Sequence, residues 1–206
     1  GVASTLTVDN IIIIPQATAK IAINDQSVTE GDSGTKILTF TVALDRMVVT
    51  GETVTVDYAT ANGTAVAGSD YVAIGTTTLT FNPGETSKTV SVTINGDTVV
   101  EGNETFFVNL SNASINATII DSQGTGTITN DDTALVSIAK TADGNEAGPV
   151  NGVFTVTQTG QSSTDTVLTV TPTGTAVNGT DYAALAATVT IPAGLTSATI
   201  TINVMN

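Results

Sequence analysis

Three carboxylates lie close together in one short stretch of the sequence, residues 94–106, which reads INGDTVVEGNETF. Asp97, Glu101 and Glu104 fall within eight residues, and no lysine or arginine lies among them. Such side chains repel one another unless a cation lies between them. Ca²⁺ prefers six to eight hard oxygen ligands at roughly 2.3–2.6 Å, so a group of carboxylates is the chemistry that suits this ion.

The composition removes most other kinds of site. The chain contains neither histidine nor cysteine, which excludes Ser-His and Cys-His nucleophiles and ordinary zinc or copper sites. A net charge of −14 with five basic residues argues against binding to nucleic acid or anionic lipid. Paired carboxylates can also hydrolyse glycosides, but that chemistry needs one acid in an apolar or aromatic pocket. With aromatic residues at 4% and no tryptophan, we expect no enzyme.

The elements that must position these carboxylates are short strands. Apolar residues alternate with polar ones between residues 20 and 132, and the segments end at turn signals such as Asn62-Gly63 and Pro83-Gly84. Seven strands are expected in about 110 residues, which predicts an all-β, antiparallel Ig-like sandwich. The expected strands are centred on residues 21–23, 38–44, 54–58, 79–81, 89–94, 106–110 and 124–129.

The pattern then restarts, which predicts two tandem sandwiches. ANGTAVAGSDY (61–71) recurs as PTGTAVNGTDY (172–182), and TLTFNPGETSKTVSVTI (78–94) recurs as TVTIPAGLTSATITINV (188–204). The predicted domains are residues 20–132 and 134–206, with a short link at 130–134. The second copy has no match to the loop that carries Asp97, Glu101 and Glu104, which we call the acidic loop, or to the last two strands of the first copy. Residues 1–19 match nothing later and are predicted as a β-rich extension.

These residues resemble the Calx-beta family, named for the calcium-binding domains of sodium–calcium exchangers. The resemblance rests on the Glu30 turn, ANGTAVAGSDY, FNPGETSKTV, GDTVVEGNETF and the terminal GTGTITNDD. It implies a Calx-beta sandwich with calcium bound by loops at one pole. The implied ligands are Glu30, Asp70, Asp97, Glu101, Glu104, Asp131 and Asp132.

Two departures from the family pattern predict fewer or weaker ions. Gly96 and Asn130 stand where exchanger domains have acidic residues. In the second copy only Glu146 and Asp181 match, so a complete second site is not expected there.

Simpler interpretations stay open for some of these residues. The acidic loop could be a solvated turn in a chain that is acidic throughout, and Asp70 could cap a turn rather than bind an ion. One feature argues against the interpretation as a solvated turn. The four acidic residues lie next to strand ends, and a sandwich can bring those ends to one pole; they are Glu101, Glu104, Asp131 and Asp132.

Three functions are compatible with this pattern. The first is a calcium-binding structural module of an extracellular or cell-surface repeat protein or filament, in which Ca²⁺ rigidifies the pole between the domains. The second is an adhesion module that holds a protein or glycan partner on the cell surface. The third, calcium sensing as in exchangers, would require attachment to a transporter.

The two ends of the sequence carry separate expectations. The chain begins at Gly1 without a visible signal peptide, which is typical of a mature product or a fragment. The longest aliphatic run, Ile11–Ile14, is far shorter than the ~20 residues of a membrane helix, so no membrane insertion is expected. Copies of the chain could associate if residues 1–19 complete the second domain of a neighbour, although a shortened segment of a longer protein gives the same pattern.

Overall fold

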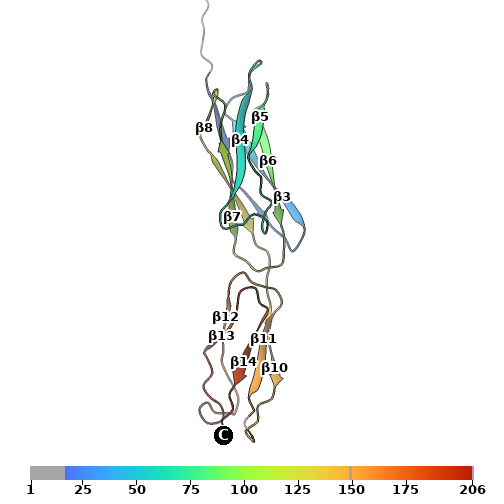
Figure 1. The fold of residues 1–206 in the computed structure, drawn as a ribbon, viewed down its shortest axis with the longest axis vertical. Coiled ribbons are helices and arrows are strands. Elements are labelled where there is room, and N and C mark those ends of the chain that lie inside the picture. The colour runs from blue at the N-terminus through green and yellow to red at the C-terminus, as the bar shows by residue number, and fades with distance from the viewer. Residues whose placement is uncertain (1–16, 149, 206) are drawn as a thin grey trace, which may run out of the picture.

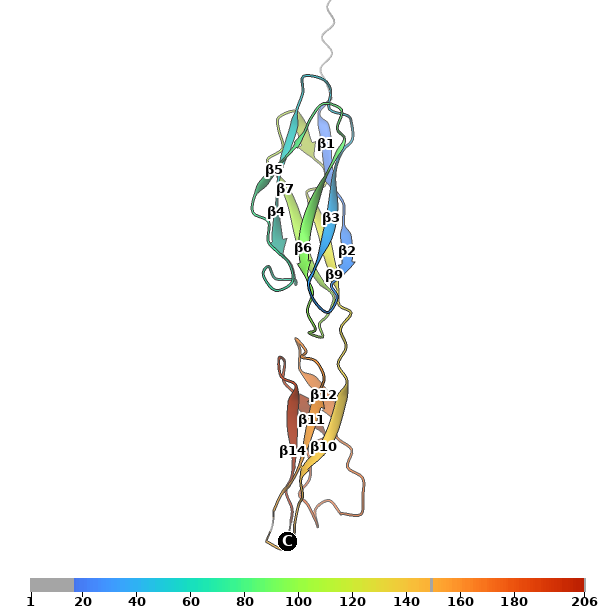
Figure 2. The ribbon, with the colours of Figure 1, turned by 90° about the vertical axis from the view of Figure 1, so that its right-hand side faces the viewer.

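The computed structural model describes residues 17–148 and 150–205, and every regular element in this part is a strand. The strands form two units that lie end to end along the long axis of the molecule (Figures 1 and 2). We call residues 17–132 unit 1 and residues 134–205 unit 2. No helix in the described part is long and apolar enough to cross a membrane.

Unit 1 is a sandwich of two sheets with the strand orders β6-β3-β1-β8 and β2-β9-β7-β4-β5. The segment that carries Asp97 and Glu101 connects β6 to β7, and therefore links the two sheets at one end of the sandwich. The strands of unit 1 are β1 (Ala19–Ile23), β2 (Gln26–Thr29), β3 (Thr35–Leu44), β4 (Val54–Asn62), β5 (Thr77–Phe81), β6 (Ser87–Asn95), β7 (Glu104–Ser111), β8 (Ala117–Ile119) and β9 (Gln123–Thr129).

Alternation of apolar and polar residues places one face of each central strand in the core. In β3, Leu38, Phe40, Val42 and Leu44 are buried while the residues between them are more exposed. The aromatic rings meet at the centre: Phe106 lies edge-on to Phe40 with the ring centroids 5.9 Å apart, and it stacks on Tyr71 at 4.5 Å. This core fixes the loops at both ends of unit 1.

The structure adds two strands to the seven predicted and makes two pairings parallel. The first predicted strand divides into β1 and β2, because the chain passes from one sheet to the other at Asn24 and Asp25. Asn24 Oδ1 accepts a hydrogen bond from Thr41 N at 2.7 Å, and Asp25 Oδ1 accepts one from Thr125 N at 2.7 Å. As a result β1 pairs in parallel with β8, and β2 pairs in parallel with β9. The other pairings are antiparallel, as predicted.

Unit 2 repeats the local geometry of unit 1. Gly68 N donates to Tyr71 O at 2.8 Å, and Gly179 N donates to Tyr182 O at the same distance. Its sheets have the orders β10-β11-β14 and β12-β13, and within residues 150–205 no strand corresponds to β7 or β9. The strands are β10 (Val136–Ala142), β11 (Gly152–Gln158), β12 (Thr166–Thr169), β13 (Thr188–Ile191) and β14 (Ser197–Ile202).

The predicted N-terminal extension falls almost entirely outside the described residues. Of residues 1–19, only Ala17, Thr18 and Ala19 are described, and Ala19 begins β1. This strand starts at the end of unit 1 that is remote from unit 2 (Figure 2).

Candidate metal centre

The predicted ligands lie in the loops at the end of unit 1 that faces unit 2, and we call this end the acidic pole. Glu30 directly follows β2, and Asp131 and Asp132 follow β9, the parallel neighbour of β2. Because the two strands run side by side, their ends meet, and Glu30 N donates to Thr129 O at 3.1 Å. One carboxylate oxygen from each of Glu30, Asp131 and Asp132 lies within 4.8 Å of the others.

A second group joins the loop after β4 to the residues at the start of β7. Asp70, Glu101 and Glu104 each place a carboxylate oxygen within 4.8 Å of the other two. Asp70 Oδ2 also accepts a hydrogen bond from Val66 N at 2.6 Å. The two interpretations of Asp70 are therefore compatible, since the carboxylate closes a turn and still belongs to the acidic group.

Asp97 belongs to neither group by distance, but its charge acts on both. Its Oδ1 accepts a hydrogen bond from Val99 N at 2.7 Å, which folds the start of the acidic loop. Electrostatic repulsion from Asp97 contributes to the raised pKa of Glu30 and to the raised pKa of Glu101. The predicted residues thus form one field of negative charge rather than two isolated groups.

Burial and mutual repulsion make ionisation unfavourable at the acidic pole. Glu30 is 4% exposed, and burial followed by the charges of Asp97 and Glu101 raises its pKa to about 7. The pKa of Glu104 also rises to about 7, through burial and then through a hydrogen bond and repulsion from Asp70. Without a cation, these carboxyl groups therefore hold their protons to a higher pH than ordinary glutamates do.

One carboxylate oxygen at the acidic pole lacks a partner. Asp132 Oδ2 is buried and makes no hydrogen bond, and it is the one such side-chain atom among the described residues. Burial raises the pKa of Asp132, and so do the charges of Asp32, Asp131 and Asp97. A buried charged oxygen without a partner is costly unless a cation contacts it.

No ion pair neutralises the acidic pole within the described ranges. The three salt bridges there join Arg46 to Glu52, Lys88 to Glu85, and Lys140 to Asp143, and each lies elsewhere. Lys36 lies beside the Glu30 loop, where its Nζ donates to Thr29 O at 2.7 Å.

Sequence reasoning missed two contributors and misjudged a third. The sequence analysis assigned no role to Lys36 or to Asp32, although the charge of Asp32 acts on Asp132. Asn130 was recognised only as a missing charge. Its Oδ1 accepts from Glu101 N at 3.3 Å and its Nδ2 donates to Asp132 O at 3.1 Å, so it ties the two acidic segments together. The run of short polar residues around Asn130 could have indicated a residue that hydrogen-bonds to neighbouring loops.

The acidic loop also makes the contact with unit 2. Val100 N donates to Gln161 O at 2.9 Å, and Ser163 N donates to Val100 O at 3.1 Å. Ser162 is 8% exposed, and its Oγ donates to Val100 O at 3.3 Å. Val100 lies between Asp97 and Glu101, so one short loop carries both carboxylates and the junction between the units.

Unit 2 reproduces only part of this arrangement. Asp181 Oδ2 accepts from Val177 N at 2.7 Å, as Asp70 does from Val66 in unit 1. Glu146 is exposed, and within residues 150–205 no group of three acidic side chains is close enough to share an ion.

The family model for the Calx-beta domain matches the chain twice, over residues 16–133 and 129–206. The chain belongs to the Calx-beta family. Curated relatives include sodium/calcium exchanger 1 of Canis lupus familiaris, 46% identical over 65 residues, and sodium/calcium exchanger 2 of Homo sapiens, 45% identical over 69 residues. These matches cover 32% and 34% of this Calx-beta chain and 7% of each exchanger.

Solved Calx-beta structures resemble the chain more loosely. The apo-form Calx CBD1 domain is 24% identical with a TM-score of 0.47, covering 56% of this chain and 99% of that domain. The calcium binding domain CBD12 of CALX1.1 is 18% identical with a TM-score of 0.46, covering 90% of this chain and 76% of that structure.

Proposed function

We propose that this chain is a calcium-binding structural module whose acidic pole takes up Ca²⁺ and thereby stiffens the joint between two Calx-beta units. The observation that carries the proposal is that four separate loops bring carboxylates to one pole in two groups, one of which contains the buried, unpartnered Asp132 oxygen. The exchangers and the calcium binding domain named above support the choice of ion.

The donor set fits Ca²⁺ rather than a softer metal. Every candidate ligand is a carboxylate oxygen, which Ca²⁺ and Mg²⁺ prefer, and Ca²⁺ accepts the irregular arrangement that loops supply. Bound Ca²⁺ would neutralise mutually repelling charges. The residues proposed to hold it are Glu30, Asp70, Asp97, Glu101, Glu104, Asp131 and Asp132.

The acidic loop also explains how a bound ion would stiffen the junction between the units. Asp97 and Glu101 lie on either side of Val100, whose backbone pairs with residues 161–163 of unit 2. The chain then crosses to unit 2 directly after Asp131 and Asp132. An ion that draws these segments together would restrict both covalent and non-covalent connections between the units.

The setting we propose is an extracellular or cell-surface repeat protein or filament. Units that stack end to end suit a rod, as Figures 1 and 2 illustrate. Extracellular modules work at calcium levels where weak sites, with Kd of ~10⁻⁴–10⁻³ M, are filled. Adhesion to a protein or glycan partner remains the alternative, and a pull-down of a specific partner by the monomeric chain would favour it.

Thermal unfolding with calcium or with EDTA tests the proposal. A ligand that binds only the folded state stabilises it by RT ln(1 + [L]/Kd), about 2.7 kcal/mol at one hundred times Kd. We expect Ca²⁺ to raise the Tm of unit 1 by several degrees and Mg²⁺ to raise it less. An unchanged midpoint in Ca²⁺ and EDTA would exclude the proposal.

A matched pair of variants supplies the control. Glu30 and Glu146 occupy the same position in the two repeats, but only Glu30 lies in an acidic group. Glu30→Gln should abolish most of the calcium-dependent rise in Tm, whereas Glu146→Gln should leave it intact. Equal responses would show that calcium acts on the overall charge rather than at the acidic pole.

A further inference from the structure

Gly96, which directly precedes Asp97 at the start of the acidic loop, packs against the Glu30 turn (residues 30–34). A Cβ atom at position 96 would lie 2.1 Å from Gly31 O and 2.9 Å from Glu30 O. Both neighbours are backbone atoms, so no rotation of a side chain can relieve these contacts. The space that a side chain would need at position 96 is therefore already filled by the carbonyl groups of the Glu30 turn.

Close approach, and not backbone conformation, is what requires glycine at position 96. The φ angle of Gly96 is not positive, so any L-residue could adopt its backbone conformation. A glycine in such a conformation is required only where another part of the chain comes too near for a Cβ atom. A substitution at this position therefore acts on the Glu30 turn that faces it.

Hydrogen bonds tie the Glu30 turn to the loops on both of its sides. Gly96 N donates to Gly34 O at 3.0 Å, which joins the turn to the acidic loop. Gly31 N donates to Asp131 Oδ1 at 2.9 Å, which joins the turn to the segment after β9. A displacement of the turn by a side chain at position 96 would therefore also disturb the carboxylate of Asp131.

We propose that Gly96 is a positioning residue of the calcium site, because its missing side chain lets the group of Glu30, Asp131 and Asp132 close against the acidic loop. This inference rests on the proposed function, since it concerns the same pole. The buried, unpartnered Oδ2 of Asp132 belongs to the group that is held in place. The contact also changes the meaning of Gly96, which the sequence indicated only as a lost ligand charge. An acidic side chain there would displace existing ligands, and should weaken calcium binding rather than restore it.

Calcium titration of the 206-residue chain by isothermal calorimetry tests the proposal. Gly102 is the matched control, because it lies in the same loop, its φ is not positive, and a Cβ atom there would have no neighbour within 4 Å. We expect Gly96→Ala to raise the Kd for Ca²⁺ at least tenfold and Gly102→Ala to leave it within twofold. Gly96→Asp should also raise the Kd, although it adds a carboxylate. Tighter binding by Gly96→Asp than by the wild-type chain would overturn the proposal.

Amide hydrogen exchange in EDTA separates a displaced turn from a lost fold. In Gly96→Ala the amide of Gly31 should exchange at least tenfold faster than in the wild-type chain, because its hydrogen bond to Asp131 is broken. Amides within the paired strands β3 and β6 should keep their wild-type protection. Unchanged exchange at Gly31 would show that the turn has not moved, and faster exchange throughout unit 1 would show a general loss of stability. Either result would overturn the proposal.

The wild-type titration distinguishes this inference from the proposed function. A wild-type chain that binds no calcium would contradict both. Calcium binding by the wild-type chain, with the same Kd in Gly96→Ala and Gly102→Ala, would overturn the role of Gly96 alone and leave the proposed function intact.

Discussion

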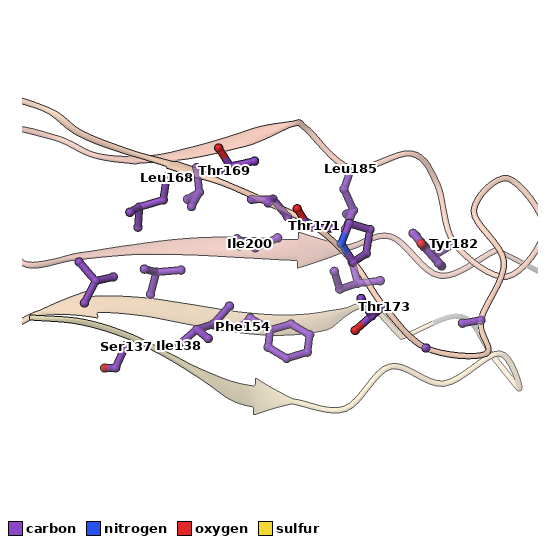
Figure 3. Close-up of a pocket in the computed structure, with 18 residues that line it drawn as sticks. Ser137, Ile138, Phe154, Leu168, Thr169, Thr171, Thr173, Tyr182, Leu185 and Ile200 are labelled. Atoms are coloured by element: carbon purple, nitrogen blue, oxygen red, sulfur yellow. The ribbon is translucent and has the colours of Figure 1, made fainter.

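Phe40 of unit 1 and Phe154 of unit 2 occupy the same position in the repeat, yet only Phe40 is fully buried, and Phe154 lines an open groove (Figure 3). The first strands differ in the same way: Ile23, which pairs with Val42, is 3% exposed, whereas its counterpart Ile138, which pairs with Val156, is 60% exposed. Among the described residues, the buried apolar cluster lies wholly within unit 1. Equivalent turns and strand pairings therefore form in both units, but only β7 and β9 convert them into a closed core.

Truncating the paired phenylalanines should produce the largest difference between the units. Phe40→Ala removes a ring that packs edge-on to Phe106 and should destabilise unit 1 by about 3–5 kcal/mol. Phe154→Ala removes a ring that is only partly buried and should cost unit 2 about 1–2 kcal/mol. Urea unfolding followed by circular dichroism measures both. Equal losses would show that the groove of unit 2 is filled in solution.

Removing calcium should loosen unit 1 and the junction while leaving the far end of unit 2 unchanged. Amide hydrogen exchange measured with Ca²⁺ and with EDTA reports this difference. Protection should fall by tenfold or more in residues 96–104 and 130–132, and also in residues 161–163, because Val100 pairs with them. Residues 178–182, which carry the counterpart of the Asp70 turn, serve as the internal control. A uniform change along the chain would contradict a local effect.

Removing calcium should make the stability of unit 1 fall as the pH rises. The raised pKa values of Glu30 and Glu104, about 7 in the folded state, mean that the folded state binds more protons than the unfolded state above pH ~4.3. In EDTA the Tm of unit 1 should therefore fall as the pH rises from 5 through about 7. With saturating Ca²⁺ the ligands are deprotonated, so the calcium-dependent rise in Tm should grow over the same interval. Glu30→Gln should flatten the decline in EDTA.

The smallest effect is expected at the junction itself. Ser162 Oγ donates to Val100 O and accepts from Thr164 N, both at 3.3 Å. Ser162→Ala removes both bonds and should cost about 0.5–1.5 kcal/mol of docking free energy. Val48 occupies the same position in unit 1. Its carbonyl oxygen accepts a hydrogen bond from Gly84 N, and the carbonyl oxygen of Ser162 accepts the equivalent bond from Gly194 N. A broader distribution of distances between spin labels on the two units would report the loss. An unchanged distribution would show that the Ser162 hydroxyl does not stabilise the junction.

The repeat and the strand pattern explain why so much of the fold was predictable. Alternating residues in β3 and β6 specify which face is buried, and the glycines of the turns specify where strands end. The parallel pairings of β1 and β2 were not predictable, because they follow from the chain changing sheets at Asn24 and Asp25. That crossing depends on hydrogen bonds to Thr41 and Thr125, which are distant in sequence.

The sequence by itself determined the all-β class and the two-fold repeat, because local periodicity and residue type carry that information, and its resemblance to the Calx-beta family implied the set of carboxylates at one pole. Only the tertiary structure decided how those carboxylates divide into two groups, that Asp132 Oδ2 is buried without a partner, and that Val100 connects the acidic loop to unit 2. These features depend on how loops separated by up to a hundred residues meet in space. The packing of the two sheets determines which loops come together, and local sequence patterns do not contain that information.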